Sequence, residues 1–109
     1  MASKKEISRG KIEKILAEYP DRVPVLVRPE KSDKTYRFLV DENITIMNFL
    51  VLLRSKIKMD SSQGIYIFIQ TGGEAILPPT SSTMGTIYHE YKNSNLVLNL
   101  VYAKENVFG

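Results

Sequence analysis

The spacing of apolar residues predicts a helix close to the N-terminus. In the segment SRGKIEKILAEYPDR, apolar side chains recur at helical spacing at Ile12, Ile15, Leu16 and Tyr19. The hydroxyl of Ser8 can cap the first turn, because it can accept a hydrogen bond from an unpaired backbone N–H group there. Pro20 ends the helix, since the residue before a proline avoids the helical conformation.

Two β-branched runs follow, at residues 23–29 and 35–40, and the polar turn EKSDK separates them. We expect the two runs to pair as an antiparallel hairpin. The first run, VPVLVRP, has a proline at each end. This composition suits a strand that lies near a sheet edge, or one that carries a proline over its first residues.

Side chains of the second run alternate between two faces of the strand. Tyr36, Phe38 and Val40 share one face, and Thr35, Arg37 and Leu39 share the other. One face belongs to the main core, and large apolar residues on both faces indicate a second, shallower hydrophobic surface. That surface either forms a small satellite core under the N-terminal helix or accepts an extended peptide as an added strand. The two interpretations are compatible, and the pattern alone favours neither.

A long amphipathic helix is predicted over residues 46–59, with the sequence IMNFLVLLRSKIKM, and Thr45 can cap its start. Its core-facing stripe consists of Ile46, Phe49, Leu50, Leu53 and Ile57. Met47, Val51 and Leu52 lie beyond this stripe. Part of the helix is therefore expected to face something other than the main core.

The remaining pattern predicts two strands, a short extended piece and a short helix. The apolar run GIYIFIQ at residues 64–70 predicts a central strand buried on both faces. TGGEA predicts a hairpin turn, because it lacks the spacing of a phosphate-binding loop, and ILPPT predicts a short extended piece. A short helix, capped by Ser81 or Ser82, is predicted from the helical spacing of Met84, Ile87, Tyr88 and Tyr91. NLVLNLVYA predicts the last strand.

The order of these elements predicts a single α+β domain over residues 1–109. Two strands, a crossing helix and further strands are typical of the β-grasp fold of ubiquitin-like domains, here with an additional N-terminal helix. The first and last strands are then neighbours at the centre of the sheet. Residues 1–7 and the tail at about 104–109 are expected to be flexible.

Composition narrows the possible functions. The 109 residues include no cysteine, which excludes a disulfide framework, a cysteine nucleophile and a thiolate metal site. His89 is the only histidine and has no evident nucleophile beside it, so we expect neither an enzyme nor a metal or cofactor site. The net charge is only +3, and no nucleic-acid partner is expected. The basic residues in SKKEISRGKIEK form either a solvated helix face or a basic surface for acidic partners or anionic lipid.

No apolar stretch approaches the roughly 20 residues needed to span a bilayer, and the N-terminus has no signal-peptide pattern. The chain ends on Gly109, soon after its last predicted strand. Such a glycine is either a frayed end, or the boundary of an expressed fragment, or a reactive group. A glycine can pass through a narrow enzyme tunnel, and its carboxylate can be activated for acyl transfer.

Four segments together resemble the autophagy ubiquitin-like modifiers of the GABARAP and microtubule-associated protein light chain type. These segments are EYPDRVPVLV, FLVDENITIMNFLVLLRSKIKM, LPPTSSTMGTIYHEY and VYAKENVFG, and the resemblance runs from about Ile12 to Gly109. It implies that Gly109, preceded by Phe108, is passed between activating and conjugating enzymes and joined to phosphatidylethanolamine. A cysteine protease would expose this glycine and release the lipid, unless the gene encodes a ready-made end. The implied locations are the cytoplasm and, after lipidation, the autophagosomal membrane.

The resemblance also implies a groove for receptors that carry an aromatic-x-x-aliphatic motif. Its aromatic pocket maps to Ile15, Pro24, Leu26, Arg37, Leu39 and Val97. Its aliphatic pocket maps to Val27, Phe38, Val40, Ile44, Phe49 and Leu52. The basic positions that meet acidic residues flanking the motif are Arg22, Arg37 and Lys56. The alternatives are an adaptor that uses this groove without being conjugated, and a modifier attached to protein lysines.

The sequence departs from the family pattern at several points. About one N-terminal helix is available, where the family usually has two. An acidic position one turn before Ile15 is Lys11 here, and an aromatic position near the groove is Val97. The turn EKSDK is shorter than usual, and QTGGEAI is longer. We therefore expect a divergent member with a reshaped aromatic pocket.

Overall fold

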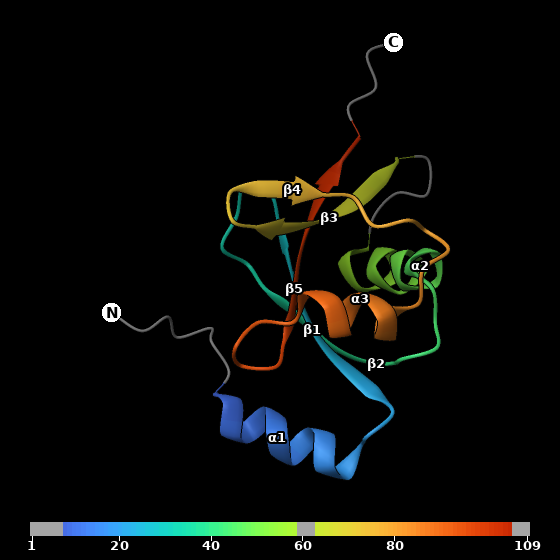
Figure 1. Cartoon of the computed structure of the whole chain (residues 1–109). Coiled ribbons are helices and arrows are strands. Elements are labelled where there is room, and N and C mark those ends of the chain that lie inside the picture. Colours follow the sequence, from blue (N-terminus) through green and yellow to red (C-terminus); the bar gives the residue numbers. More distant parts are fainter. Residues whose placement is uncertain (1–7, 59–62, 106–109) are drawn as a thin grey trace.

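A mixed five-stranded sheet organises the protein (Figure 1). The computed structural model describes residues 8–58 and 63–105. The strands are β1 (Arg22–Pro29), β2 (Tyr36–Asp41), β3 (Ile65–Thr71), β4 (Glu74–Ile76) and β5 (Leu98–Lys104), in the spatial order β2-β1-β5-β3-β4. The helices are α1 (Arg9–Glu18), α2 (Ile46–Ile57) and α3 (Met84–Tyr91).

The first and last strands lie side by side at the centre of the sheet, as predicted. β1 is parallel to β5 and antiparallel to β2. The pairing of β1 with β5 begins at Val25, which lies opposite Leu98. Pro24 precedes that ladder, so its missing N–H group removes no bond from it. The predicted α+β, β-grasp arrangement is confirmed by this topology.

α2 crosses the sheet and supplies the centre of the main core. Its N-cap is Thr45, as predicted: the Thr45 hydroxyl accepts the Asn48 N–H at 3.1 Å, and Asn48 completes a capping box. Phe49 and Leu53 are fully buried against the sheet. Met47, Val51 and Leu52 are exposed, as the stripe analysis predicts, with exposed fractions of 57%, 62% and 44%.

The predicted cap of α3 was wrong. The N-cap is Thr83, whose hydroxyl accepts the Thr86 N–H at 3.3 Å, rather than Ser81 or Ser82. The reason is a tertiary contact: Ser82 O accepts the Ile46 N–H at 2.9 Å, and a β-bridge joins Thr83 to Thr45. This bridge holds Ser82 in the loop, so that the helix starts after Thr83.

Two other boundaries differ from the prediction. Gly72 and Gly73 both have positive φ and form the predicted hairpin turn, but pairing resumes at Glu74, before ILPPT. The last strand begins at Leu98 rather than three residues earlier, because residues 93–97 form a turn. It continues to Lys104, which the sequence places at the start of the tail.

α1 lies apart from α2 and α3, beside the start of β1 (Figure 1). Ser8 is its N-cap, as predicted, and accepts the Lys11 N–H at 3.4 Å. Ile12 is its one buried residue, at 1% exposure. Ile12 lines a cavity together with Arg37 and Leu39 of β2, so the second, shallower surface expected from the two-faced strand lies beside α1.

Candidate functional site

An apolar cavity of about 320 Å³ lies between α1, β1 and β2. This volume is at the lower end of the ~300–1,000 Å³ of ligand pockets. The lining residues are Lys11, Ile12, Ile15, Pro24, Val25, Leu26, Arg37, Phe38, Leu39 and Val97. Eight of these ten are apolar, and the two polar ones are both cations.

All six residues that the family resemblance maps to an aromatic pocket line this cavity: Ile15, Pro24, Leu26, Arg37, Leu39 and Val97. Ile12 and Val25 also line the cavity and were not predicted to do so, and Phe38 lines it although it was predicted for the aliphatic pocket. The position of Ile12, three residues before Ile15 on the same helix face, is a signal that could have found it.

The strand register brings the cavity walls together. Pro24 lies opposite Leu39, and Leu26 lies opposite Arg37. Because side chains alternate along β1, Pro24 and Leu26 point away from the valines that enter the main core. Two adjacent strands therefore present one continuous surface toward α1.

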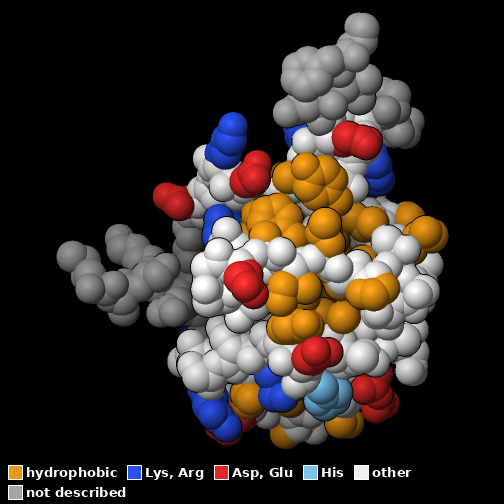
Figure 2. All heavy atoms as spheres, turned by 45° about the horizontal axis from the view of Figure 1, so that its top comes forward, with side chains coloured by type: hydrophobic (Ala, Val, Ile, Leu, Met, Phe, Trp, Pro, Cys, Tyr) orange, Lys and Arg blue, Asp and Glu red, His pale blue; other side chains and the backbone are white. Residues whose placement is uncertain are grey.

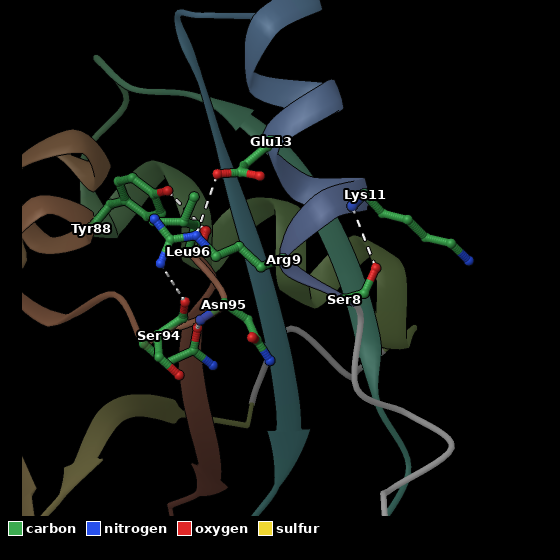
Figure 3. A network of polar contacts seen from close by, with 9 residues as sticks. Ser8, Arg9, Lys11, Glu13, Tyr88, Ser94, Asn95 and Leu96 are labelled. Atoms are coloured by element: carbon green, nitrogen blue, oxygen red, sulfur yellow. Dashed lines mark hydrogen bonds and ion pairs between the residues drawn. The ribbon is translucent and has the colours of Figure 1, made fainter.

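The far wall of the cavity, at Val97, is held by hydrogen bonds from the turn at residues 93–97. Asn93 Oδ1 accepts the Val97 N–H at 3.0 Å, and Val97 O accepts the Asn93 N–H at 2.9 Å. The Tyr88 hydroxyl donates to Leu96 O at 2.8 Å (Figure 3). Burial raises the pKa of Tyr88, which keeps this hydroxyl protonated as a donor.

Arg9 joins α1 to the same turn. Its guanidinium donates to Ser94 O at 3.2 Å and pairs with Glu13 at 3.4 Å (Figure 3). The Glu13 pair is largely exposed and contributes little by itself. The bond to Ser94 connects two segments 85 residues apart, and so it helps to set the position of α1 over the cavity.

β2 forms the open side of the site. It is the outermost strand on its side of the sheet, and it pairs with β1 alone among the described strands. Its outer edge therefore carries backbone N–H and C=O groups to which a further strand can bond. An extended peptide added here would run beside Leu39, which is 38% exposed.

The residues assigned to an aliphatic pocket are placed differently. Val27, Val40 and Phe49 are buried in the main core, at 0%, 6% and 0% exposure. Phe38 and Ile44 are partly buried against that core, and Leu52 is 44% exposed. The structure therefore leaves Phe38, Ile44 and Leu52 accessible to a ligand, because the other three are buried in the main core.

The predicted basic positions are at the surface. Arg22, Arg37 and Lys56 are all exposed, and Arg22 lies opposite Asp41 in the β1–β2 pairing. Of these three cations, only Arg37 lines the cavity. The terminal pair Phe108 and Gly109 lies outside the described residues.

His89 is exposed on α3, on a face where hydrophobic side chains also gather (Figure 2). Its ring contacts that of Tyr88 in a T-shaped arrangement with centroids 5.6 Å apart.

Within residues 8–58 and 63–105, no group of His, Cys, Asp and Glu side chains could hold a metal ion. In the same residues, no helix is both long and apolar enough to cross a membrane.

A sheet that packs around a crossing helix, with parallel first and last strands, defines a ubiquitin-like module. The family model described as "Autophagy protein Atg8 ubiquitin like" matches residues 8–109. The chain therefore belongs to the Atg8 family of ubiquitin-like autophagy proteins.

Individual relatives agree with this assignment. Autophagy-related protein 8d of Arabidopsis thaliana is 39% identical over 101 residues, which cover 88% of this chain and 81% of that protein. Autophagy-related protein 8 of Schizosaccharomyces pombe is 38% identical over 104 residues, with coverages of 89% and 81%. The crystal structure of Trypanosoma brucei ATG8 superposes with a TM-score of 0.78 at 25% identity and covers 100% of both chains.

Proposed function

We propose that this Atg8-family protein is a membrane-conjugated modifier that recruits receptors through the edge of its sheet. In this proposal, an aromatic-x-x-aliphatic segment adds to β2 as a further strand. The observation that supports it most is the coincidence of an unpaired strand edge with an apolar cavity beside the same strand. Backbone bonds along the edge give affinity, and the cavity selects the side chain.

The two ends of the motif would meet different surfaces. The aromatic side chain would enter the cavity between α1 and β2. The aliphatic side chain would rest on Phe38, Ile44 and Leu52, whose accessible surfaces border β2 and α2. Acidic residues beside the motif would meet the exposed cations Arg22, Arg37 and Lys56.

Calorimetric titration of a motif peptide tests the docking proposal. Leu39→Ala and Arg37→Glu are each expected to weaken binding by about 1–3 kcal/mol, if they lie at an energetic centre of the interface. Val51→Ala is a matched control, because Val51 is 62% exposed on α2 and does not line the cavity. Unchanged affinity in both groove variants would refute this assignment.

Conjugation is proposed to proceed through Gly109. ATP would convert its carboxylate to an acyl adenylate and release pyrophosphate, a thiol of the activating enzyme would displace AMP to form a thioester, and the acyl group would then pass to a thiol of the conjugating enzyme. The final amide would join this glycine to the amine of phosphatidylethanolamine and release the enzyme thiol. Incubation with both enzymes, ATP and phosphatidylethanolamine vesicles is expected to raise the mass by one lipid, less one water. Gly109→Ala should abolish the adduct without unfolding the protein.

The outcomes separate the possible functions. No adduct, while the same enzymes lipidate another family member, would refute lipid conjugation and favour a non-covalent adaptor. Linkage of Gly109 to a protein lysine, detected as a branched peptide by mass spectrometry, would favour a protein modifier instead. Processing by a cysteine protease would be shown by cleavage of a chain extended beyond Gly109.

A further inference from the structure

The polar side chains that line the cavity are all hydrogen-bond donors, with no acceptor among them. Lys11 and Arg37 bring hydrogen-bond donors, and the other lining side chains are apolar, so the lining set contains no side-chain acceptor. In the part of the chain that the structure describes, neither cation forms an ion pair. Both remain available to a ligand that enters from the β2 side.

Two backbone carbonyls of lining residues already accept hydrogen bonds. Ile15 O accepts the Tyr19 N–H at 2.7 Å, and Val97 O accepts the Asn93 N–H at 2.9 Å. The residues contributed by β1 lie between two paired strands, β2 and β5. A donor that a ligand carries deep into the cavity, away from the open edge of β2, would therefore meet no side-chain acceptor.

The absence of a side-chain acceptor affects tryptophan, phenylalanine and tyrosine anchors differently. The indole of tryptophan carries an N–H donor and no acceptor, so its burial here would leave that donor without a partner. Phenylalanine brings no polar group and loses nothing. A tyrosine hydroxyl has lone pairs that can accept a hydrogen bond from the Lys11 ammonium or the Arg37 guanidinium.

We propose that the cavity selects tyrosine as the aromatic anchor of its peptide ligands and disfavours tryptophan, and that Lys11 determines this specificity. The proposal rests on the docking function proposed above and names the ligand class for the same site. Lys11 is suited to this role because it is exposed on α1 and lines the cavity without belonging to the core. Its replacement should therefore change selectivity without unfolding the domain.

The test uses three peptides that are identical except for tyrosine, phenylalanine or tryptophan at the anchor, each titrated by calorimetry. The tyrosine peptide is expected to bind about tenfold more tightly than the tryptophan peptide, with phenylalanine between them. Lys11→Glu replaces a donor with a carboxylate, which can accept a hydrogen bond from either the indole N–H or the tyrosine hydroxyl, and it is expected to abolish the preference for tyrosine over tryptophan. Lys14→Glu is the matched control, because it makes the same charge change on the same helix outside the cavity lining.

The outcomes separate the anchor preference, the role of Lys11 and the docking function from one another. Equal or tighter binding of the tryptophan peptide by the unmodified protein would overturn the anchor preference while leaving the docking function intact. An unchanged preference in Lys11→Glu, or the same loss of preference in Lys14→Glu, would overturn the role of Lys11. Failure of all three peptides to bind would refute the docking function itself, and the anchor preference with it.

Discussion

Phe49 is the residue whose replacement tests the packing between α2 and β2 most sharply. It is 0% exposed, and its ring meets that of Phe38 edge to face, with centroids 5.0 Å apart and an interplanar angle of 69°. Phe49→Leu keeps an apolar side chain of similar size, and such core exchanges cost up to about 1.5 kcal/mol. Loss of the aromatic pair adds about 0.5–1.5 kcal/mol. The free energy of unfolding should therefore fall by about 0.5–3 kcal/mol.

Urea denaturation followed by circular dichroism measures this loss. With an m-value of about 1–3 kcal/mol per molar, the midpoint should fall by roughly 1 M while the slope stays unchanged. Val51→Ala on the exposed side of the same helix is the control and should change stability by less than about 0.5 kcal/mol. A loss in Phe49→Leu no larger than that of the control would refute the packing described for α2.

A double-mutant cycle isolates the aromatic contact. Phe38→Leu and Phe49→Leu should show a coupling energy of about 0.5–1.5 kcal/mol, because the two rings touch directly. Phe38 also lines the cavity, so this pair links the main core to the proposed binding edge. Additive losses, with coupling below about 0.3 kcal/mol, would contradict that link.

Three further changes have defined outcomes. Thr45→Ala should lower the free energy of unfolding by about 1 kcal/mol in a urea titration, because α2 loses its N-cap and capping box; an unchanged midpoint would contradict the role of this cap. Gly73→Ala should lower the free energy of unfolding by about 1–2 kcal/mol, because Gly73 has a φ of +85°. Gly10→Ala within α1 is the control and should be neutral or stabilising in the same assay. The pKa of Tyr102 is raised by burial first, and then by the charge of Tyr36 and a hydrogen bond to Tyr36. The stability linked to the neutral form of Tyr102 is therefore fully present below about pH 10 and is lost as the pH rises through the folded-state pKa. Tyr102→Phe should remove this part of the alkaline loss, and an identical decline in the two proteins between about pH 8 and pH 11 would refute it.

The sequence predicts correctly those helices and strands whose pattern of apolar residues agrees with their burial in the folded protein. The stripe that contains Phe49 and Leu53 predicts the buried face of α2, and alternation along β2 separates Phe38 from Leu39 correctly. The α3 cap could not be predicted, because the bridge between Thr45 and Thr83 is a contact between distant segments. Local propensity cannot distinguish Ser82 from Thr83 without that contact.

The candidate site was likewise predicted in part from the sequence and revealed in part only by the structure. The six residues predicted for the aromatic pocket lie together around the cavity, yet only the structure reveals that Ile12 and Val25 also line it. It also places Val27 and Phe49 inside the core, because burial depends on contacts between elements that are distant in the sequence. The unbalanced donors at Lys11 and Arg37 become apparent only when α1 and β2 are placed side by side.

The most direct test of the docking proposal is an amide chemical-shift titration with a motif peptide. We expect the largest shifts along β2 and around the cavity, at Ile12, Leu39 and Val97, as the peptide adds to the sheet edge. Phe68 and Ala103, which form a separate buried cluster, should shift little. Shifts concentrated at that cluster, with β2 unaffected, would contradict the proposed binding edge.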